Sequence, residues 1–174
     1  MQKISKYILI ILLTTNNLLL IGEEIIKTSS GIISGFEKDK VMNWNDIPYA
    51  KPPVGDLRWK APQLIFKSNE KIISKEGNFC VQEPYKRGGA PGDEEVSGTE
   101  DCLYLNIQAP LSSTESKLPV MFWIHGGGNT SGLKDSYNFS KLVQKEKVIV
   151  ISINYRLGAF GWFTHPSIQS LQSG

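Results

Sequence analysis

In Leu118-Pro-Val-Met-Phe-Trp-Ile-His-Gly-Gly-Gly128 an apolar run ends in a histidine and three glycines. A second nearly continuous apolar run, Val148-Ile-Val-Ile-Ser-Ile-Asn154, follows it. Such runs are typical of strands that are covered on both faces. Residues 136–147 between them can form one short helix, whose inward side chains would be Phe139, Leu142 and Val143. A further strand is expected at residues 102–109, so this half of the chain predicts an α/β protein with a mixed sheet.

The first half of the chain is expected to be less regular. Residues 31–37 and 41–47 are short alternating segments separated by Lys38-Asp39-Lys40, which predicts a small antiparallel hairpin. Residues 48–59 contain three prolines and a glycine, and residues 60–100 have mostly loop character. The sequence therefore predicts a small hairpin followed by the central strands of a mixed sheet.

The glycines after the first apolar run point to a specific chemistry. Acyl transfer builds negative charge on the substrate's carbonyl oxygen, and consecutive glycines let backbone N–H groups approach that oxygen without an intervening side chain. Each such donor, about 2.7–3.1 Å from the oxyanion, contributes on the order of 10² to 10³ in rate. Loops of the type His125-Gly126-Gly127-Gly128 have this role in lipases and esterases. The alternative is a tight glycine turn that only ends a strand.

Composition and charge restrict the class of protein. The chain has 174 residues, of which 40% are hydrophobic and 10% aromatic, as expected of one globular domain with a sizeable core. Its 19 basic and 17 acidic residues differ in number only because Lys3 and Lys6 lie within the first 22 positions. The balanced remainder gives no reason to expect nucleic acid as a partner.

The first 22 residues have the order of a secretory signal peptide. Lys3 and Lys6 supply the positive start, and residues 7–13 form an unbroken apolar run. A membrane anchor is the alternative, but it needs about 18–20 continuous apolar residues, and the polar residues 14–17 interrupt this run. We therefore expect cleavage near Gly22 and a secreted or lumenal domain over residues 23–174, without a membrane span.

Secretion changes how the only two cysteines, Cys80 and Cys102, are interpreted. An oxidising compartment favours a disulfide over two free thiols. A metal site is the alternative, but the cysteines and the distant His125 and His165 show no ligand spacing. We therefore expect a disulfide, and neither a metal nor a cofactor.

Four segments resemble, in order, the motifs of the carboxylesterase and cholinesterase family: residues 45–59, 99–107, 118–128 and 153–162. They include Ile-Pro-Tyr-Ala-Lys-Pro-Pro, Glu-Asp-Cys-Leu-Tyr-Leu-Asn and Asn-Tyr-Arg-Leu-Gly-Ala-Phe-Gly. The resemblance implies the amino-terminal part of an α/β-hydrolase fold. It also implies a type-B carboxylesterase, which acts on small-molecule esters through an acyl-serine intermediate.

The same resemblance implies roles for individual residues. Gly127 and Gly128 stand where the family places its oxyanion donors. His125 then shapes the loop and is not the catalytic base, because the base comes late in the family's sequences. Arg58 and Glu100 are similar to the family's buried ion pair, which ties the proline-rich loop to the strand that follows.

The sequence also lacks a motif that this chemistry requires. The nucleophile of an α/β hydrolase lies in Gly-x-Ser-x-Gly and is followed by an acid and a histidine. No Gly-x-Ser-x-Gly occurs in residues 1–174. The resemblance implies that the family continues past Gly174 toward this serine, and toward a partner for Arg156. We therefore expect this chain alone to be inactive. A neuroligin-like adhesion protein, with the same fold but no triad, is the alternative function.

Three residues bear on substrate and glycosylation. Cholinesterases hold choline over a tryptophan of the disulfide loop, whereas Tyr85 is the only aromatic residue between the cysteines here. We therefore expect a general carboxylesterase.

Asn129 stands where the family often has a large aromatic residue, and Asn129 and Asn138 each begin a glycosylation sequon. We expect Asn129 to be too enclosed for a glycan, which leaves Asn138 as the candidate. The sequence gives no indication of the oligomeric state.

Overall fold

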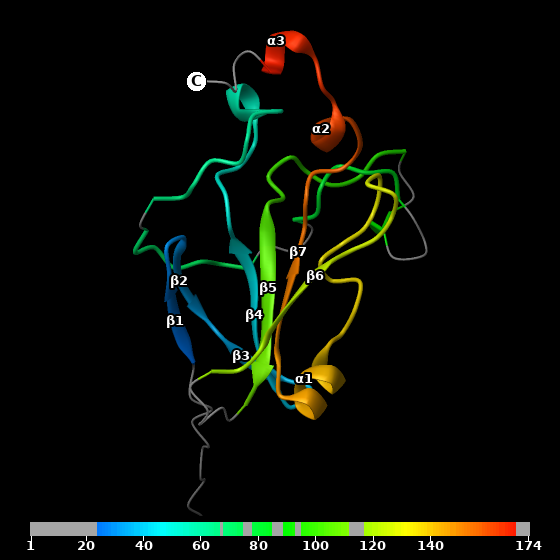
Figure 1. Ribbon diagram of the computed structural model, residues 1–174. Coiled ribbons are helices and arrows are strands. Elements are labelled where there is room, and N and C mark those ends of the chain that lie inside the picture. The colour runs from blue at the N-terminus through cyan, green and yellow to red at the C-terminus, as the bar shows by residue number, and fades with distance from the viewer. Residues whose placement is uncertain are drawn as a thin grey trace, which may run out of the picture.

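The computed structural model describes residues 24–66, 68–74, 78–84, 89–92, 95–111 and 117–169. A two-stranded sheet pairs β1 (Ile25–Thr28) with β2 (Gly31–Ser34) beside a larger mixed sheet (Figure 1). The larger sheet has the order β3 (Phe36–Lys38), β4 (Val41–Pro48), β5 (Tyr104–Pro110), β7 (Ile149–Ile153) and β6 (Val120–Ile124). The predicted mixed sheet is confirmed, and so are the strands predicted in the second half of the chain.

The predicted amino-terminal hairpin is formed by β3 and β4, which are antiparallel. Asp39 and Lys40 connect them with φ angles of 53° and 59°, as in the two-residue turns whose twist matches that of the flanking strands. The predicted first segment, residues 31–37, is divided at Gly35 between β2 and β3. Strand β1 was not predicted, because its four residues are too short to give a clear alternating pattern.

The parallel pair of the sheet is β6 and β7, which helix α1 (Ser140–Glu146) connects. Val143 of this helix is fully buried in the core, as predicted. The helix begins later than predicted, because the side-chain oxygen of Asn138 accepts the N–H of Ser140 at 2.9 Å. Leu142 was predicted to face inward, but it is 36% exposed. It lies about 100° around the helix from Val143, which turns it toward solvent.

The two apolar strands differ in how far the described residues cover them. Strand β7 lies inside the sheet between β5 and β6, whereas β6 is its edge. Val120, Phe122 and Ile124 are 58%, 54% and 60% exposed. Side chains alternate between the two faces of a strand, and no described element covers the face that carries these three.

Between β4 and β5 the chain is mostly loop, as predicted, with one 3-10 helix, η1 (Gly55–Leu57), among its described residues. Helices α2 (Gly158–Trp162) and α3 (Pro166–Gln169) follow β7 and lie at the opposite end of the sheet from α1 (Figure 1). The longest helix in the described part of the chain has seven residues. A membrane-spanning helix needs about 20, so none of the described helices can cross a bilayer. The predicted signal peptide lies outside the described residues.

Candidate functional site

The glycine loop follows directly on β6, at the end of the sheet where the parallel strands β6 and β7 finish. In open α/β sheets, ligands bind outside the carboxyl ends of such strands. A cleft of about 780 Å³ opens there, and Gly127 lies in its wall. The other walls come from the segment around Gln82 and from the start of α2, including Leu157 and Phe160.

The loop turns sharply at Gly127, whose φ angle is 114°. Its carbonyl oxygen accepts the N–H groups of Thr130 at 3.1 Å and Ser131 at 3.2 Å, which closes the turn. A Cβ atom on Gly127 would lie 1.9 Å from the Ser131 carbonyl oxygen, so only glycine fits. The N–H groups of Gly127 and Gly128 donate to no described residue, and both glycines are exposed. Two adjacent donors are therefore available to a ligand, and the first of them, on Gly127, lies in the wall of the cleft.

His125 lies underneath this turn and is 4% exposed. Its ring stacks on Tyr155, with centroids 4.3 Å apart, and the Tyr155 hydroxyl donates to the His125 carbonyl oxygen at 2.7 Å. Burial lowers the pKa of His125, although the hydrogen bond with the Gly126 carbonyl opposes this shift. The imidazole is thus neutral at pH 7 and packs as a support for the loop.

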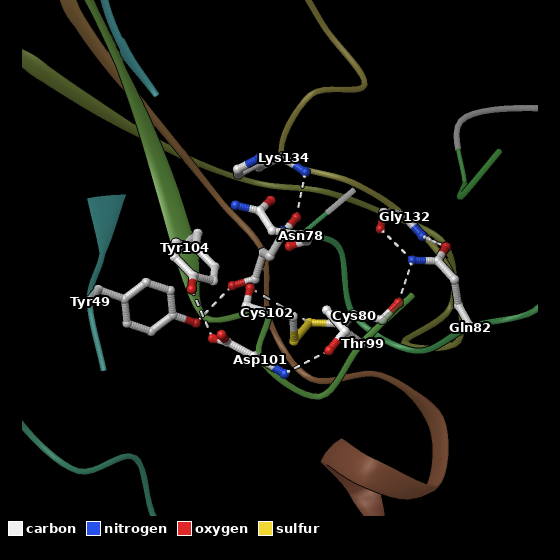
Figure 2. Close-up of a disulfide and its surroundings, with 11 residues drawn as sticks. Tyr49, Asn78, Cys80, Gln82, Thr99, Asp101, Cys102, Tyr104, Gly132 and Lys134 are labelled. Carbon is white, nitrogen blue, oxygen red and sulfur yellow. Dashed lines mark hydrogen bonds between the residues drawn. A yellow bond between two sulfur atoms is a disulfide. The ribbon is translucent and has the colours of Figure 1, made fainter. Parts of the chain in front are cut away.

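A disulfide joins Cys80 and Cys102, with the sulfur atoms 2.00 Å apart (Figure 2). Both cysteines are almost fully buried. Beside the bridge, Cys80 pairs with Thr99 and Gln82 pairs with Ser97. The two ends of the disulfide loop are thus held together by backbone pairing as well as by the covalent bond.

Arg58 and Glu100 form the predicted ion pair, in which Arg58 Nε donates to Glu100 Oε2 at 2.6 Å and Nη2 bonds Oε1. The prediction that the pair is buried is wrong for the described residues. The Arg58 side chain is 41% exposed and that of Glu100 is 18% exposed. The Arg58 guanidinium also lies 5.7 Å from the ring centroids of Trp59 and Phe160. The pair therefore lies at the surface, on an aromatic support.

A buried polar network near the loop was not predicted. Lys134 Nζ lies 2.9 Å from Asp46 Oδ1, and the two side chains are 3% and 8% exposed. Asn78 donates to the same carboxylate at 2.7 Å, and Ser74 donates its hydroxyl. Burial alone would raise the pKa of Asp46, but these hydrogen bonds and the Lys134 charge outweigh it and hold the pKa below 3.8. Residues 46 and 134 are far apart in the sequence, so no local pattern could have indicated the pair.

Asn154 connects this network to the end of β7. Its side chain accepts the N–H of Lys134 at 2.8 Å and donates to the carbonyl oxygen of Asn78 at 3.0 Å. Figure 2 shows Lys134 and Asn78 beside the disulfide. The chain that follows the glycine loop is therefore fixed to the sheet and to the segment that enters the disulfide loop.

The two sequon asparagines, Asn129 and Asn138, and the residues Arg156 and His165 lie outside the disulfide and the ion pairs of the described part of the chain. Asn129 is exposed among the described residues, with a φ angle of 62°, and its enclosure in the fold of the whole protein stays a prediction. Asn138 is also exposed, and its amide donates to Asp39 Oδ2 at 2.9 Å. Arg156 has a buried Nη1 atom without a hydrogen-bond partner among the described residues. His165 is exposed directly before α3, and its Nδ1 accepts the N–H of Ser167.

Comparison with known proteins places these features in a family. A family model described as the carboxylesterase family matches residues 22–172. A carboxylic ester hydrolase of Bombus ignitus is 42% identical over 146 aligned residues, and the match covers 80% of this chain and 26% of the relative. Para-nitrobenzyl esterase of Bacillus subtilis is 42% identical over 147 residues, covering 83% of this chain and 29% of the relative. A solved structure of a thermophilic PNB esterase superimposes with a TM-score of 0.75 at 37% identity and covers 87% of this chain and 32% of that one.

The mixed sheet with a glycine turn at the end of its parallel strands is part of an α/β-hydrolase fold. The chain belongs to the carboxylesterase family. It spans about a quarter to a third of the length of the relatives that it matches.

Proposed function

We propose that the whole protein of which this chain is part is a secreted carboxylic ester hydrolase that acts through an acyl-serine intermediate. The proposal rests on two adjacent N–H groups, of Gly127 in the wall of a cleft and of Gly128 next to it, which donate to no described residue in a chain of the carboxylesterase family. The relatives named carboxylic ester hydrolase and para-nitrobenzyl esterase support the same class of reaction.

In this reaction a serine oxygen attacks the ester carbonyl carbon, and the carbonyl oxygen becomes an oxyanion. The Gly127 and Gly128 N–H groups stabilise that charge more strongly than they bind the neutral ester, so they lower the barrier of the chemical step. The alcohol leaves, and water then hydrolyses the acyl-enzyme by the same route. The serine, the acid and the histidine base are not supplied by residues 1–174, so this chain by itself is expected to be inactive.

The cleft favours esters with apolar groups. Val81, Leu157 and Phe160 contribute apolar walls next to Gly127. An alkyl or aryl group of the ester can therefore be buried beside the oxyanion donors. Tyr85 lies outside the described residues, so the preference for a general carboxylesterase over a cholinesterase stays a prediction from the sequence.

Secreted whole protein, assayed with para-nitrophenyl acetate and butyrate and with acetylthiocholine, tests the proposed function. We expect saturable turnover of the para-nitrophenyl esters, with a lower kcat/KM for acetylthiocholine. Turnover of none of the three above the buffer rate would contradict an esterase, and would favour a non-catalytic adhesion protein of the same fold.

A further inference from the structure

The side chain of Gln82 joins the disulfide loop to the chain that leaves the glycine turn. Gln82 is 4% exposed, and its amide group makes four hydrogen bonds. Oε1 accepts the N–H groups of Gly132 at 2.9 Å and Ala90 at 3.1 Å. Nε2 donates to the carbonyl oxygens of Gly132 and Cys80, both at 3.0 Å. Figure 2 shows the amide facing both backbone groups of Gly132.

The backbone that carries this side chain is fixed. The Gln82 N–H and carbonyl groups exchange two hydrogen bonds with Ser97, each of 2.9 Å. Cys80, two residues earlier, is held by the disulfide to Cys102. Because both the backbone and the amide of Gln82 are fully bonded, the side chain can hold Gly132 in one position and orientation.

Gly132 is confined from its other side by the ring under the turn. Its φ angle is 132°, and a Cβ atom here would lie 2.0 Å from His125 Nδ1. Gly132 therefore packs between the His125 ring and the Gln82 amide. Ser131, the residue before it, closes the turn through its N–H bond to the Gly127 carbonyl oxygen. A shift of Gly132 is thus transmitted within two residues to Gly127.

We propose that Gln82 is a positioning residue for the oxyanion turn. The disulfide loop sets the direction of the Gly127 and Gly128 N–H groups through this one buried amide, and so contributes to the rate as well as to stability. This inference rests on the proposed function, in which those N–H groups hold the oxyanion. Gln82 acts through Gly132 and is assigned no contact with the substrate.

Two substitutions in the whole protein separate positioning from packing. Gln82→Met keeps the length of the side chain and removes all four hydrogen bonds. We expect kcat to fall by about tenfold to a hundredfold, because a displacement of about 1 Å at a reacting group is enough for a loss of this size. KM should change by less than about twofold, since the interaction that is lost belongs to the transition state. Gln82→Glu keeps the two accepted bonds and should retain a higher kcat than Gln82→Met.

Asn43→Leu is the matched control. Asn43 is also a buried amide, 5% exposed, whose Nδ2 donates to the carbonyl oxygens of Lys38 and Val41. It lies near the start of β4, at the end of the sheet remote from the glycine loop. This variant should lower the melting temperature and leave kcat within about twofold of wild type, as expected when buried hydrogen bonds are lost far from the turn.

Hydrogen exchange of the whole protein, followed in the peptide that covers residues 125–133, gives a readout that needs no catalysis. We expect faster exchange in this peptide for Gln82→Met and Gln82→Glu, and unchanged exchange for Asn43→Leu. Wild-type kcat in a folded Gln82→Met variant, or unchanged exchange in this peptide, would overturn the positioning role. If the wild type hydrolyses no ester, the proposed function fails, and the exchange rates still decide whether Gln82 holds the turn.

Discussion

Replacing Gly127 by alanine in the whole protein perturbs the oxyanion turn directly. The added Cβ would lie 1.9 Å from the Ser131 carbonyl oxygen, whereas Cβ contacts under 3.0 Å essentially do not occur. The turn must therefore open by about 1 Å, and the N–H of residue 127 moves with it. Displacing one oxyanion donor costs on the order of 10² to 10³ in kcat, or about 2.7–4 kcal/mol of transition-state stabilisation.

The assay is hydrolysis of para-nitrophenyl acetate, with kcat normalised to the concentration of reactive serine. Gly31→Ala is the matched control, because its Cβ would also be too close to a backbone oxygen, 2.6 Å from that of Glu70, but in the β1–β2 hairpin. We expect the control to lose stability and to keep the kcat of its folded fraction. A folded Gly127→Ala variant with wild-type kcat would refute the role of the turn.

Four further outcomes are expected. Cys80→Ser with Cys102→Ser should lower the free energy of unfolding by about 3 kcal/mol, and recovery of both cysteines as free thiols from the secreted protein would contradict the bridge. Lys134→Met should lower the free energy of unfolding by about 3–5 kcal/mol, because it leaves the Asp46 carboxylate buried without its cation. The pKa of Asp46 is lowered in the folded state. The contribution of this carboxylate to stability is therefore present above pH 3.8 and is lost as the pH falls through the folded pKa. Asp46→Asn should therefore remove this part of the pH dependence of the free energy of unfolding, which urea titrations at several pH values measure. An unchanged pH profile would show that Asp46 makes no such contribution. Residues 23–174 expressed alone should hydrolyse no ester and should aggregate through the exposed apolar face of β6. Light scattering measures the aggregation, and a soluble monomer with a sharp melting transition would contradict this prediction.

The elements that could be predicted from the sequence are those with a strong local pattern. Two strands were placed correctly from the apolar runs at residues 120–124 and 149–153. The loop was placed correctly from the prolines and the glycine of residues 48–59, because these residues restrict the backbone locally. The inward face of α1 was predicted only in part. Val143 is buried, but Leu142 is not, because an apolar residue beside the inward stripe can equally face solvent.

The features that were missed depend on contacts between distant segments. Which of the two apolar strands lies at the sheet edge depends on which strands pair, and an apolar run does not specify its neighbours. The network around Asp46 and Lys134 and the four bonds of Gln82 join residues that share no spacing in the sequence. The exposure of the Arg58–Glu100 pair could not be read from its motif, since a motif identifies partners and not what covers them.

A crystal structure of the whole protein with a trifluoromethyl ketone, which forms a tetrahedral adduct with a reactive serine, tests whether Gly127 and Gly128 hold the oxyanion. We expect a serine–carbon bond and an adduct oxygen about 2.7–3.1 Å from the backbone nitrogens of both Gly127 and Gly128. An adduct whose oxygen is bound elsewhere, or a protein that forms no adduct while this turn stays intact, would contradict this expectation.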